Sequence, residues 1–223
     1  IIWKYENDRE VLALIYLVKH LRRHCFRDIY LRMPYIPNAR MDRVKNPEDV
    51  FTLKYFCEII NDLGFTEVDV LDPHSSVSEA LLDNLFVGSP KHYIQEAIDR
   101  MCGNATAGRN FMLFYPDEGS MKRYSGVLNI IHAFGIKKRD WKTGEILGLD
   151  VAGAVDEIAG RDILIVDDIC SRGGTFLHSA KKLKELGAKD IYLYVSHCEN
   201  TILEGDLLKG DLIKRVYTTD SIF

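Results

Sequence analysis

The sequence predicts an α/β protein with two domains, each built on a mainly parallel sheet flanked by helices. Strand-like and helix-like segments alternate along the 223 residues, and this alternation implies βαβ crossovers. Some strand-like segments, such as residues 162–166, are almost entirely apolar, as is typical of parallel strands that are covered on both faces. Gly88, Ser89 and Pro90 interrupt the alternation and mark the expected seam between the domains.

The N-terminal domain is expected over residues 1–88, with its beginning truncated. Its helices follow from apolar residues that recur three and four positions apart, and its strands from short apolar runs. We expect the Asp8 side chain to cap the first helix and Gly64 to end the second. The expected order is a strand-like run at 1–3, a helix from Asp8 to about residue 21, a strand at 28–33, a loop at 34–46, a helix at 47–63, a strand at 67–71 and a crossover at 75–90.

The C-terminal domain is expected over residues 89–223. Its segment 137–155 is charged and contains Gly144 and Gly148, which predicts a mobile lid rather than a regular element. The other expected elements are a helix at 91–102, a strand at 111–115, a helix or turn at 118–128, a strand at 129–136, a strand at 162–166, a helix at 174–187, a strand at 190–195, a short helix near 201–209 and a strand at 214–218.

The composition indicates an ordinary globular protein of the cytoplasm. Hydrophobic residues make up 47% and charged residues 28%, and the net charge of -4 provides no broad surface for a nucleic acid. No apolar run reaches the ~20 residues of a membrane helix, so no membrane partner is expected. The five cysteines lack CxxC spacing, which argues against a zinc site and favours a reducing compartment. The chain starts at Ile1 without a signal-peptide pattern, and we expect both ends to have been cut from a longer protein.

The strongest chemical signal is the segment ILIVDDICSRGGTF at residues 163–176. A buried strand is expected to deliver Asp167 and Asp168 to its carboxyl end, where open α/β sheets bind ligands. The glycine-containing loop leads into a helix, so its backbone N–H groups suit a phosphate. Acids beside a phosphate site predict a sugar phosphate, with the carboxylates on its hydroxyls or on a metal. The structural alternative is a solvated turn followed by a capped helix.

The segment VDDICSRGGT resembles the phosphoribosyl-pyrophosphate (PRPP) motif that type I phosphoribosyltransferases and PRPP synthetases share. Other segments resemble only the PRPP synthetase, or ribose-phosphate diphosphokinase, family. In chain order these are YIPNARMDR at 35–43, DPH at 72–74, DNLF at 83–86, YPDEGSMKR at 115–123, KKR at 137–139, SH at 196–197 and TDSI at 219–222. The resemblance extends in register from about Ile1 to Phe223 and implies a phosphoribosyltransferase-like fold in both domains.

The resemblance implies transfer of the diphosphoryl group of ATP to the C1 hydroxyl of ribose 5-phosphate, or of a related ribosyl phosphate. The products would be PRPP, or an analogue, and AMP. It also implies Mg²⁺ as cofactor and a homo-oligomer. The implied roles are catalysis by Lys137, Arg139 and His74; ATP binding by Arg40, Asp42 and His74; diphosphate binding by Asp117, Gly119, Ser120 and Lys122; ribose-phosphate binding by Asp167, Asp168, Ser171, Arg172, Gly173, Gly174 and Thr175; and metal binding by His74 and Asp117.

The chain departs from the family pattern in several places. Ser171-Arg172 stands where the family usually has Asp-Thr, which leaves the acceptor open. Met41 replaces a Gln, and Ser120 replaces a Gly in the diphosphate loop. The family's adenine-binding segment would precede Ile1.

Simpler interpretations remain for each motif. Arg40 and Asp42 can form a surface ion pair, and the Asp117 segment can be an acid-rich helix start. The basic residues 137–139 can form a solvated loop, and Cys170 can be an inert residue rather than a sensitive thiol. For the whole chain, the alternatives are a phosphoribosyltransferase that consumes PRPP and a non-catalytic regulatory subunit of a synthetase.

Overall fold

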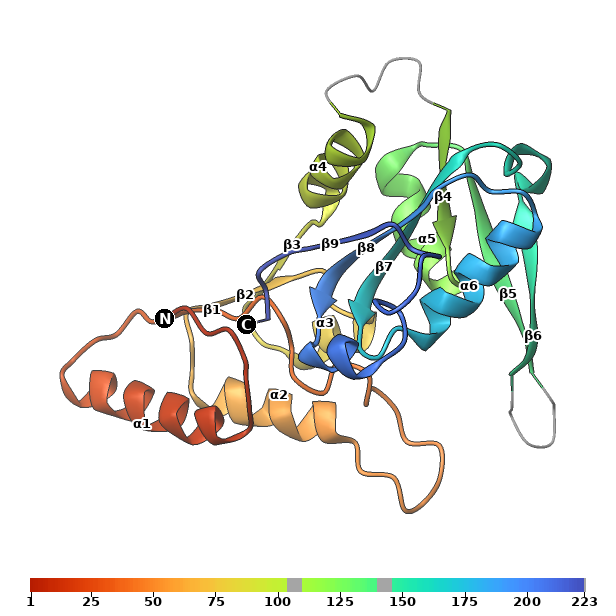
Figure 1. Ribbon diagram of the computed structural model, residues 1–223. Coiled ribbons are helices and arrows are strands. Elements are labelled where there is room, and N and C mark those ends of the chain that lie inside the picture. The colour runs from red at the N-terminus through yellow and green to blue at the C-terminus, as the bar shows by residue number, and fades with distance from the viewer. Residues whose placement is uncertain (104–109, 140–145, 223) are drawn as a thin grey trace. The chain divides into compact units, whose positions relative to one another are not determined.

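The computed structural model describes residues 1–103, 110–139 and 146–222, and its secondary structure is drawn in Figure 1. The chain forms two compact units: Ile1–Pro90 together with the residues after Thr219, and Lys91–Thr219. The sequence analysis placed the seam at residue 88 and the whole C-terminus in the second domain. The chain instead returns to the first unit at its end, where Lys4 Nζ lies 2.7 Å from Asp220 Oδ2.

The first unit contains a parallel sheet in the order β1-β2-β3. Its elements are α1 (Arg9–Arg23), β1 (Tyr30–Arg32), α2 (Thr52–Asp62), β2 (Glu67–Leu71), α3 (Ser76–Leu81) and β3 (Leu85–Gly88). The sequence analysis missed α3 and β3, which lie inside the expected crossover. Strand β3 has only four residues, three of them apolar, and its pairing with β2 defines it as a strand.

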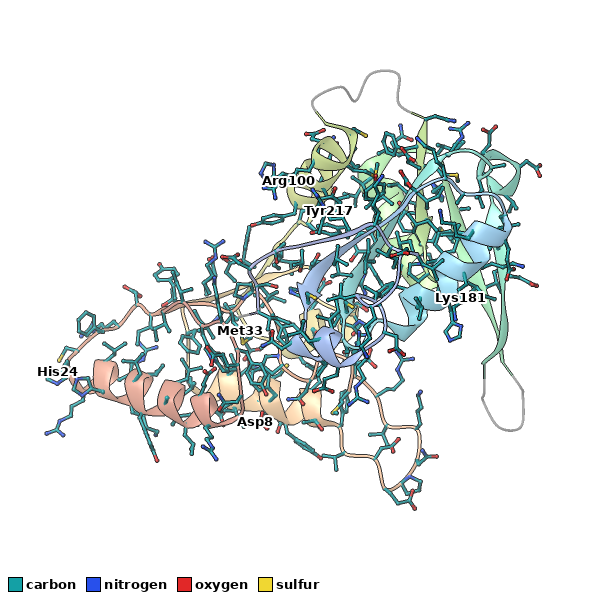
Figure 2. All side chains as sticks on the ribbon, in the orientation of Figure 1. Asp8, His24, Met33, Arg100, Lys181 and Tyr217 are labelled. Carbon is teal, nitrogen blue, oxygen red and sulfur yellow. The ribbon has the colours of Figure 1, made fainter. Side chains whose placement is uncertain are left out.

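The start of α1 corrects one prediction (Figure 2, where Asp8 is labelled). The Asp8 side chain makes no capping hydrogen bond to the helix backbone. Its carboxylate instead accepts a hydrogen bond from the Tyr5 hydroxyl at 2.7 Å. The N-cap residue is still Asp8, but the side chain that contacts the first turn is that of Asn7, whose Oδ1 accepts from the Arg9 backbone N–H at 3.1 Å.

Helix α2 begins later than predicted but ends as predicted. Asp49 Oδ2 accepts hydrogen bonds from the backbone N–H groups of Lys45 and Asn46, both at 2.9 Å, and so stabilises a turn ahead of the helix. Gly64 follows the helix with a φ of +63°, the left-handed conformation that glycine adopts at helix ends.

The second unit is built on a six-stranded sheet in the order β6-β5-β4-β7-β8-β9. All neighbouring strands are parallel except β5 and β6, which are antiparallel. The elements are α4 (Lys91–Cys102), β4 (Phe111–Tyr115), α5 (Glu118–Leu128), β5 (His132–Arg139), β6 (Ile146–Gly153), η1 (Val155–Glu157), β7 (Asp162–Cys170), α6 (Gly174–Glu185), β8 (Ile191–Cys198), η2 (Asn200–Glu204) and β9 (Arg215–Thr218).

Helices cover both faces of this sheet, which confirms the predicted α/β class. Met112 and Phe114 of β4 belong to one buried cluster with α6, whereas Leu113 and Tyr115 belong to another with α4 and α5. This alternation is the period of a strand covered on both sides. Lys181 lies on the outer side of α6, exposed to solvent (Figure 2).

Two strands of the second unit extend beyond their predicted ends. Strand β7 continues through the acid pair to Cys170, paired with β8 as far as Cys198. Strand β5 continues through Arg139, because β6 pairs with it antiparallel. Of the lid expected at 137–155, residues 140–145 lie outside the described part of the chain. Residues 137–139 and 146–153 belong to β5 and β6, and Leu149 and Val151 of β6 pack on the α6-side core. Within the described ranges, no helix has the length and apolar character needed to span a bilayer.

Candidate functional site

A short loop joins β7 to α6 at the carboxyl edge of the parallel sheet. Gly173 has a φ of +79°, and a Cβ atom there would lie 2.5 Å from Leu207 Cδ1, so the position requires glycine. No side chain caps α6 at Gly173, which leaves the helix N-terminus as a site for an anion. The loop lies where the sequence predicts it, between β7 and α6, and its role in phosphate binding stays a prediction.

The two adjacent acids of β7 are both contacted by α5. The Ser120 hydroxyl donates a hydrogen bond to Asp167 Oδ1 at 2.6 Å. Arg123 Nη1 lies 2.7 Å from Asp168 Oδ2, and Asp168 Oδ1 accepts from the Ile169 backbone N–H at 2.7 Å. Ser120 and Arg123 are three residues apart and so lie on one face of the helix. That face of α5 holds the acid pair in place.

Electrostatics distinguish the two acids. Burial raises the pKa of Asp167, and the negative charges of Asp168 and Asp117 raise it further, to about 7, although the Ser120 hydrogen bond opposes this change. Asp168 is buried, and Arg123 compensates its charge. The site therefore combines one paired carboxylate with one that gains and loses a proton near neutral pH.

The expected diphosphate-binding loop is the first turn of α5. Asp117 is the N-cap residue, and its Oδ1 accepts from the Ser120 backbone N–H at 3.1 Å. Lys122 is exposed and lies 3.4 Å from Glu118 on the same helix. The Ser120 N–H thus already has an acceptor, the side chain of Asp117. Asp117, Ser120 and Asp167 are nonetheless brought together, because the Ser120 hydroxyl also lies 3.3 Å from Asp117 Oδ1.

In the first unit, Asp42 interacts with Arg43 and His74. It is 4% exposed, and the Arg43 guanidinium donates to both of its oxygens, at 2.8 and 3.2 Å. Burial alone would raise the pKa of Asp42, but the Arg43 hydrogen bonds and the charges of Arg43 and His74 hold it below its usual value. The ion-pair partner of Asp42 is thus its neighbour Arg43, whereas Arg40 is exposed. The structure brings Asp42 and His74 close enough to interact.

The remaining predicted residues are placed less fully. The backbones of Lys137 and Arg139 lie in β5, opposite Leu149 and Ile146 of β6, and their side chains fall outside the described part of the chain. His74 belongs to the first unit and Asp117 to the second. In the described ranges, no group of three His, Cys, Asp or Glu side chains is placed to hold a metal ion.

Two residues of the site were missed by the sequence analysis. Arg123 lies in a quoted motif but received no role, although its spacing from Ser120 would have placed both on one helix face. Glu199 accepts a hydrogen bond from the Ser171 hydroxyl. Its contact depends on the pairing of Cys170 with Cys198 in β7 and β8, for which the local sequence has no signal.

The fold and site define an α/β protein whose mainly parallel sheet carries an acid pair and a glycine-containing loop at the carboxyl end of β7. No protein-family model matches the chain. It is 28% identical over 223 residues to a ribose-phosphate pyrophosphokinase of Pasteurella multocida, and the alignment covers 97% of this chain and 68% of that protein. It is 27% identical to a ribose-phosphate pyrophosphokinase of Brucella melitensis, which covers 98% of this chain and 69% of that protein.

A solved phosphoribosylpyrophosphate synthetase from Mycobacterium smegmatis has the same fold, with a TM-score of 0.76 at 18% identity over 95% of this chain and 68% of that chain. The chain is therefore related to the ribose-phosphate pyrophosphokinases over nearly its whole length, as its motifs predict. It spans about two thirds of the length of these relatives.

Proposed function

We propose that this protein transfers the diphosphoryl group of ATP to the C1 hydroxyl of ribose 5-phosphate, or of a closely related ribosyl phosphate. The hydroxyl oxygen forms a bond to the β-phosphorus of ATP, the bond from that phosphorus to the α-phosphate oxygen breaks, and the hydroxyl proton is lost. The products are PRPP, or its analogue, and AMP. The relationship to ribose-phosphate pyrophosphokinases supports this reaction.

The observation that carries the proposal is the adjacency of the acid pair and the loop at the end of β7. A sugar phosphate has hydroxyls at one end and a phosphate at the other. The carboxylates of Asp167 and Asp168 can accept hydrogen bonds from the hydroxyls. The loop from Ser171 to Thr175 and the uncapped N-terminus of α6 suit the phosphate.

Magnesium fits the donors around Ser120. The Ser120 hydroxyl lies within hydrogen-bond distance of both Asp117 and Asp167, so hard oxygen ligands converge there. The repulsion that raises the pKa of Asp167 is one that a bound cation would offset. Mg²⁺ commonly binds one or two carboxylates and completes its shell with water and phosphate oxygens. When bound, it would neutralise negative charge on the transferred diphosphate; a role for His74 as a further ligand stays a prediction.

The first unit supplies the proposed ATP side of the reaction. Arg40 is exposed, and its guanidinium suits bidentate binding of a phosphate. Asp42 and His74 form the neighbouring pair, with the Asp42 charge maintained by Arg43. We further propose that Lys137 and Arg139 stabilise the charge that develops in the transition state, and that the protein acts as a homo-oligomer.

The test is AMP release from ATP and Mg²⁺ with ribose 5-phosphate, compared with the same mixture without the sugar. We expect sugar-dependent AMP, and we expect Lys137→Ala and Arg139→Ala to lower turnover far more than they weaken ATP binding. A screen of other ribosyl phosphates addresses the acceptor that Ser171-Arg172 leaves open. Release of pyrophosphate from PRPP with a nucleobase, and no AMP, would indicate a phosphoribosyltransferase instead. Absence of both reactions, with ligand binding retained, would indicate a non-catalytic subunit.

A further inference from the structure

The Ser171 hydroxyl is tied to a carboxylate from the next strand. It donates a hydrogen bond to Glu199 Oε2, and Thr201 donates to the same oxygen at 3.3 Å. The Glu199 backbone N–H donates to the Cys170 carbonyl at 2.8 Å. Both the main chain and the side chain of Glu199 therefore contact the start of the phosphate loop.

This contact decides how Ser171 can bind a ligand. A serine hydroxyl has one proton to donate and two lone pairs that accept. Because the proton is directed to Glu199, the Ser171 hydroxyl can contact a ligand only as an acceptor. A hydrogen bond to an ionised acceptor also polarises the hydroxyl and strengthens the next bond in the chain. The pair thus offers a ligand what a carboxylate would offer, an acceptor for a hydroxyl proton.

The segment after β8 fixes the geometry of this pair. Arg172 Nη2 lies 3.0 Å from Glu204 Oε2, and a Cβ atom on Gly205 would lie 2.0 Å from the Arg172 carbonyl oxygen. Leu207 packs directly against Gly173. Each residue of the loop at 171–173 therefore contacts the segment 199–207.

We propose that Glu199 is a positioning residue, which orients the Ser171 hydroxyl so that its oxygen accepts a hydrogen bond from the 2- or 3-hydroxyl of the sugar phosphate. This inference rests on the proposed function of the loop and specifies one contact within it: the Ser171 side chain binds the sugar, whereas the backbone N–H groups of the loop bind the phosphate. It also explains how a serine, three residues after the acid pair, can accept a hydrogen bond where the family usually has an aspartate. Glu199 acts through Ser171 and does not itself contact the sugar.

The test measures binding of ribose 5-phosphate by calorimetry to wild type, Glu199→Ala, Glu199→Gln, Ser171→Ala and the double alanine variant. We expect Glu199→Ala to weaken binding ~10-fold, the scale of one hydrogen bond, and Glu199→Gln to weaken it less, because the amide oxygen still accepts. The double variant should bind no more weakly than Ser171→Ala, since the two residues act as one unit. ATP affinity should not change.

Deoxy analogues locate the contact. With one of the two analogues, 2-deoxy- or 3-deoxyribose 5-phosphate, Glu199→Ala should cause no loss of affinity. That analogue lacks the hydroxyl that Ser171 binds. Asp206→Asn, an exposed change on the same segment, is the matched control and should bind like wild type. Circular dichroism and melting temperature verify that each variant is folded.

Three results would overturn the inference: unchanged affinity in folded Glu199→Ala, losses that add fully in the double variant, or equal losses for ribose 5-phosphate and both deoxy analogues. Each of these leaves the proposed function standing. Failure of the wild-type protein to bind ribose 5-phosphate would count against the proposed function itself, and the inference would then fall with it.

Discussion

At the scale of single residues, the pair between Arg123 and Asp168 joins a half-buried guanidinium to a buried carboxylate. Asp168 has a side-chain exposure of 5%, so removal of Arg123 would leave a buried charge without its partner. We predict that Arg123→Ala lowers the free energy of unfolding by about 3 kcal/mol, measured by urea denaturation.

The matched control for this prediction is Arg161→Ala. The Arg161 side chain is 24% exposed, close to the 28% of Arg123, but its partner Glu157 is 48% exposed. Surface pairs of this kind contribute about 1 kcal/mol or less. Equal losses in the two variants would show that the charge of Asp168 does not depend on Arg123.

The raised pKa of Asp167 predicts that the stability of the protein depends on pH. Its pKa is raised to about 7 by burial and by the charges of Asp168 and Asp117, so the folded state holds a proton more tightly than the unfolded state does. The stability that follows is complete below about pH 4, the ordinary Asp pKa, and is lost as pH rises through about 7. Asp167→Asn mimics the protonated form. In Mg²⁺-free buffer, we predict that its melting temperature exceeds that of wild type by more at about pH 8 than at about pH 5.

Asp190 provides the contrast, because the hydrogen bond from Lys214 lowers the pKa of its carboxyl group. The stability from this pair is present above the unfolded pKa and is lost as pH falls. Asp190→Asn should therefore be less stable than wild type at about pH 8, with a smaller deficit in acid. A melting-temperature difference for Asp167→Asn that stays constant with pH would contradict the role assigned to its burial.

At the scale of elements, the turn from β7 into α6 depends on one of its two glycines. Gly173 has a positive φ and lies against Leu207, whereas a Cβ atom on Gly174 would meet nothing within 4 Å. We predict that Gly173→Ala lowers the free energy of unfolding by more than ~1 kcal/mol, and that Gly174→Ala is neutral or slightly stabilising, both measured by urea denaturation. Comparable losses in both variants would mean that the close approach of Leu207 does not restrict the turn.

The elements that the sequence analysis missed share a physical cause. Strand β3 has two exposed central residues, Phe86 and Val87, and it is a strand because it pairs with β2. Strand β6 contains glycines and an aspartate, which resemble a loop in sequence. It becomes a strand because it pairs with the edge of β5 and packs Leu149 on the core. Pairing partners of this kind are distant in sequence, so a local pattern does not reveal them.

At the scale of the whole molecule, the return of the chain to the first unit after Thr219 could not be predicted from local sequence patterns either. Lys4 and Asp220 form an ion pair although they lie near opposite ends of the sequence, and Ser221 is buried. The Thr219 hydroxyl, in contrast, donates to the Ser196 carbonyl of β8 in the second unit at 2.6 Å. The chain thus passes from one unit to the other between Thr219 and Asp220, and the composition of the sequence does not change at that point.

The sequence by itself determined the alternation of helices and strands, the two-unit α/β class, and the acid pair followed by a glycine loop. These features are local, because hydrophobic period and glycine spacing act within one strand–turn–helix segment. Only the tertiary structure decided which groups meet that segment: Ser120 on Asp167, Arg123 on Asp168, and Glu199 on Ser171. These partners are 28 to 47 residues away along the chain, and the packing of α5 and β8 against β7 sets their distances.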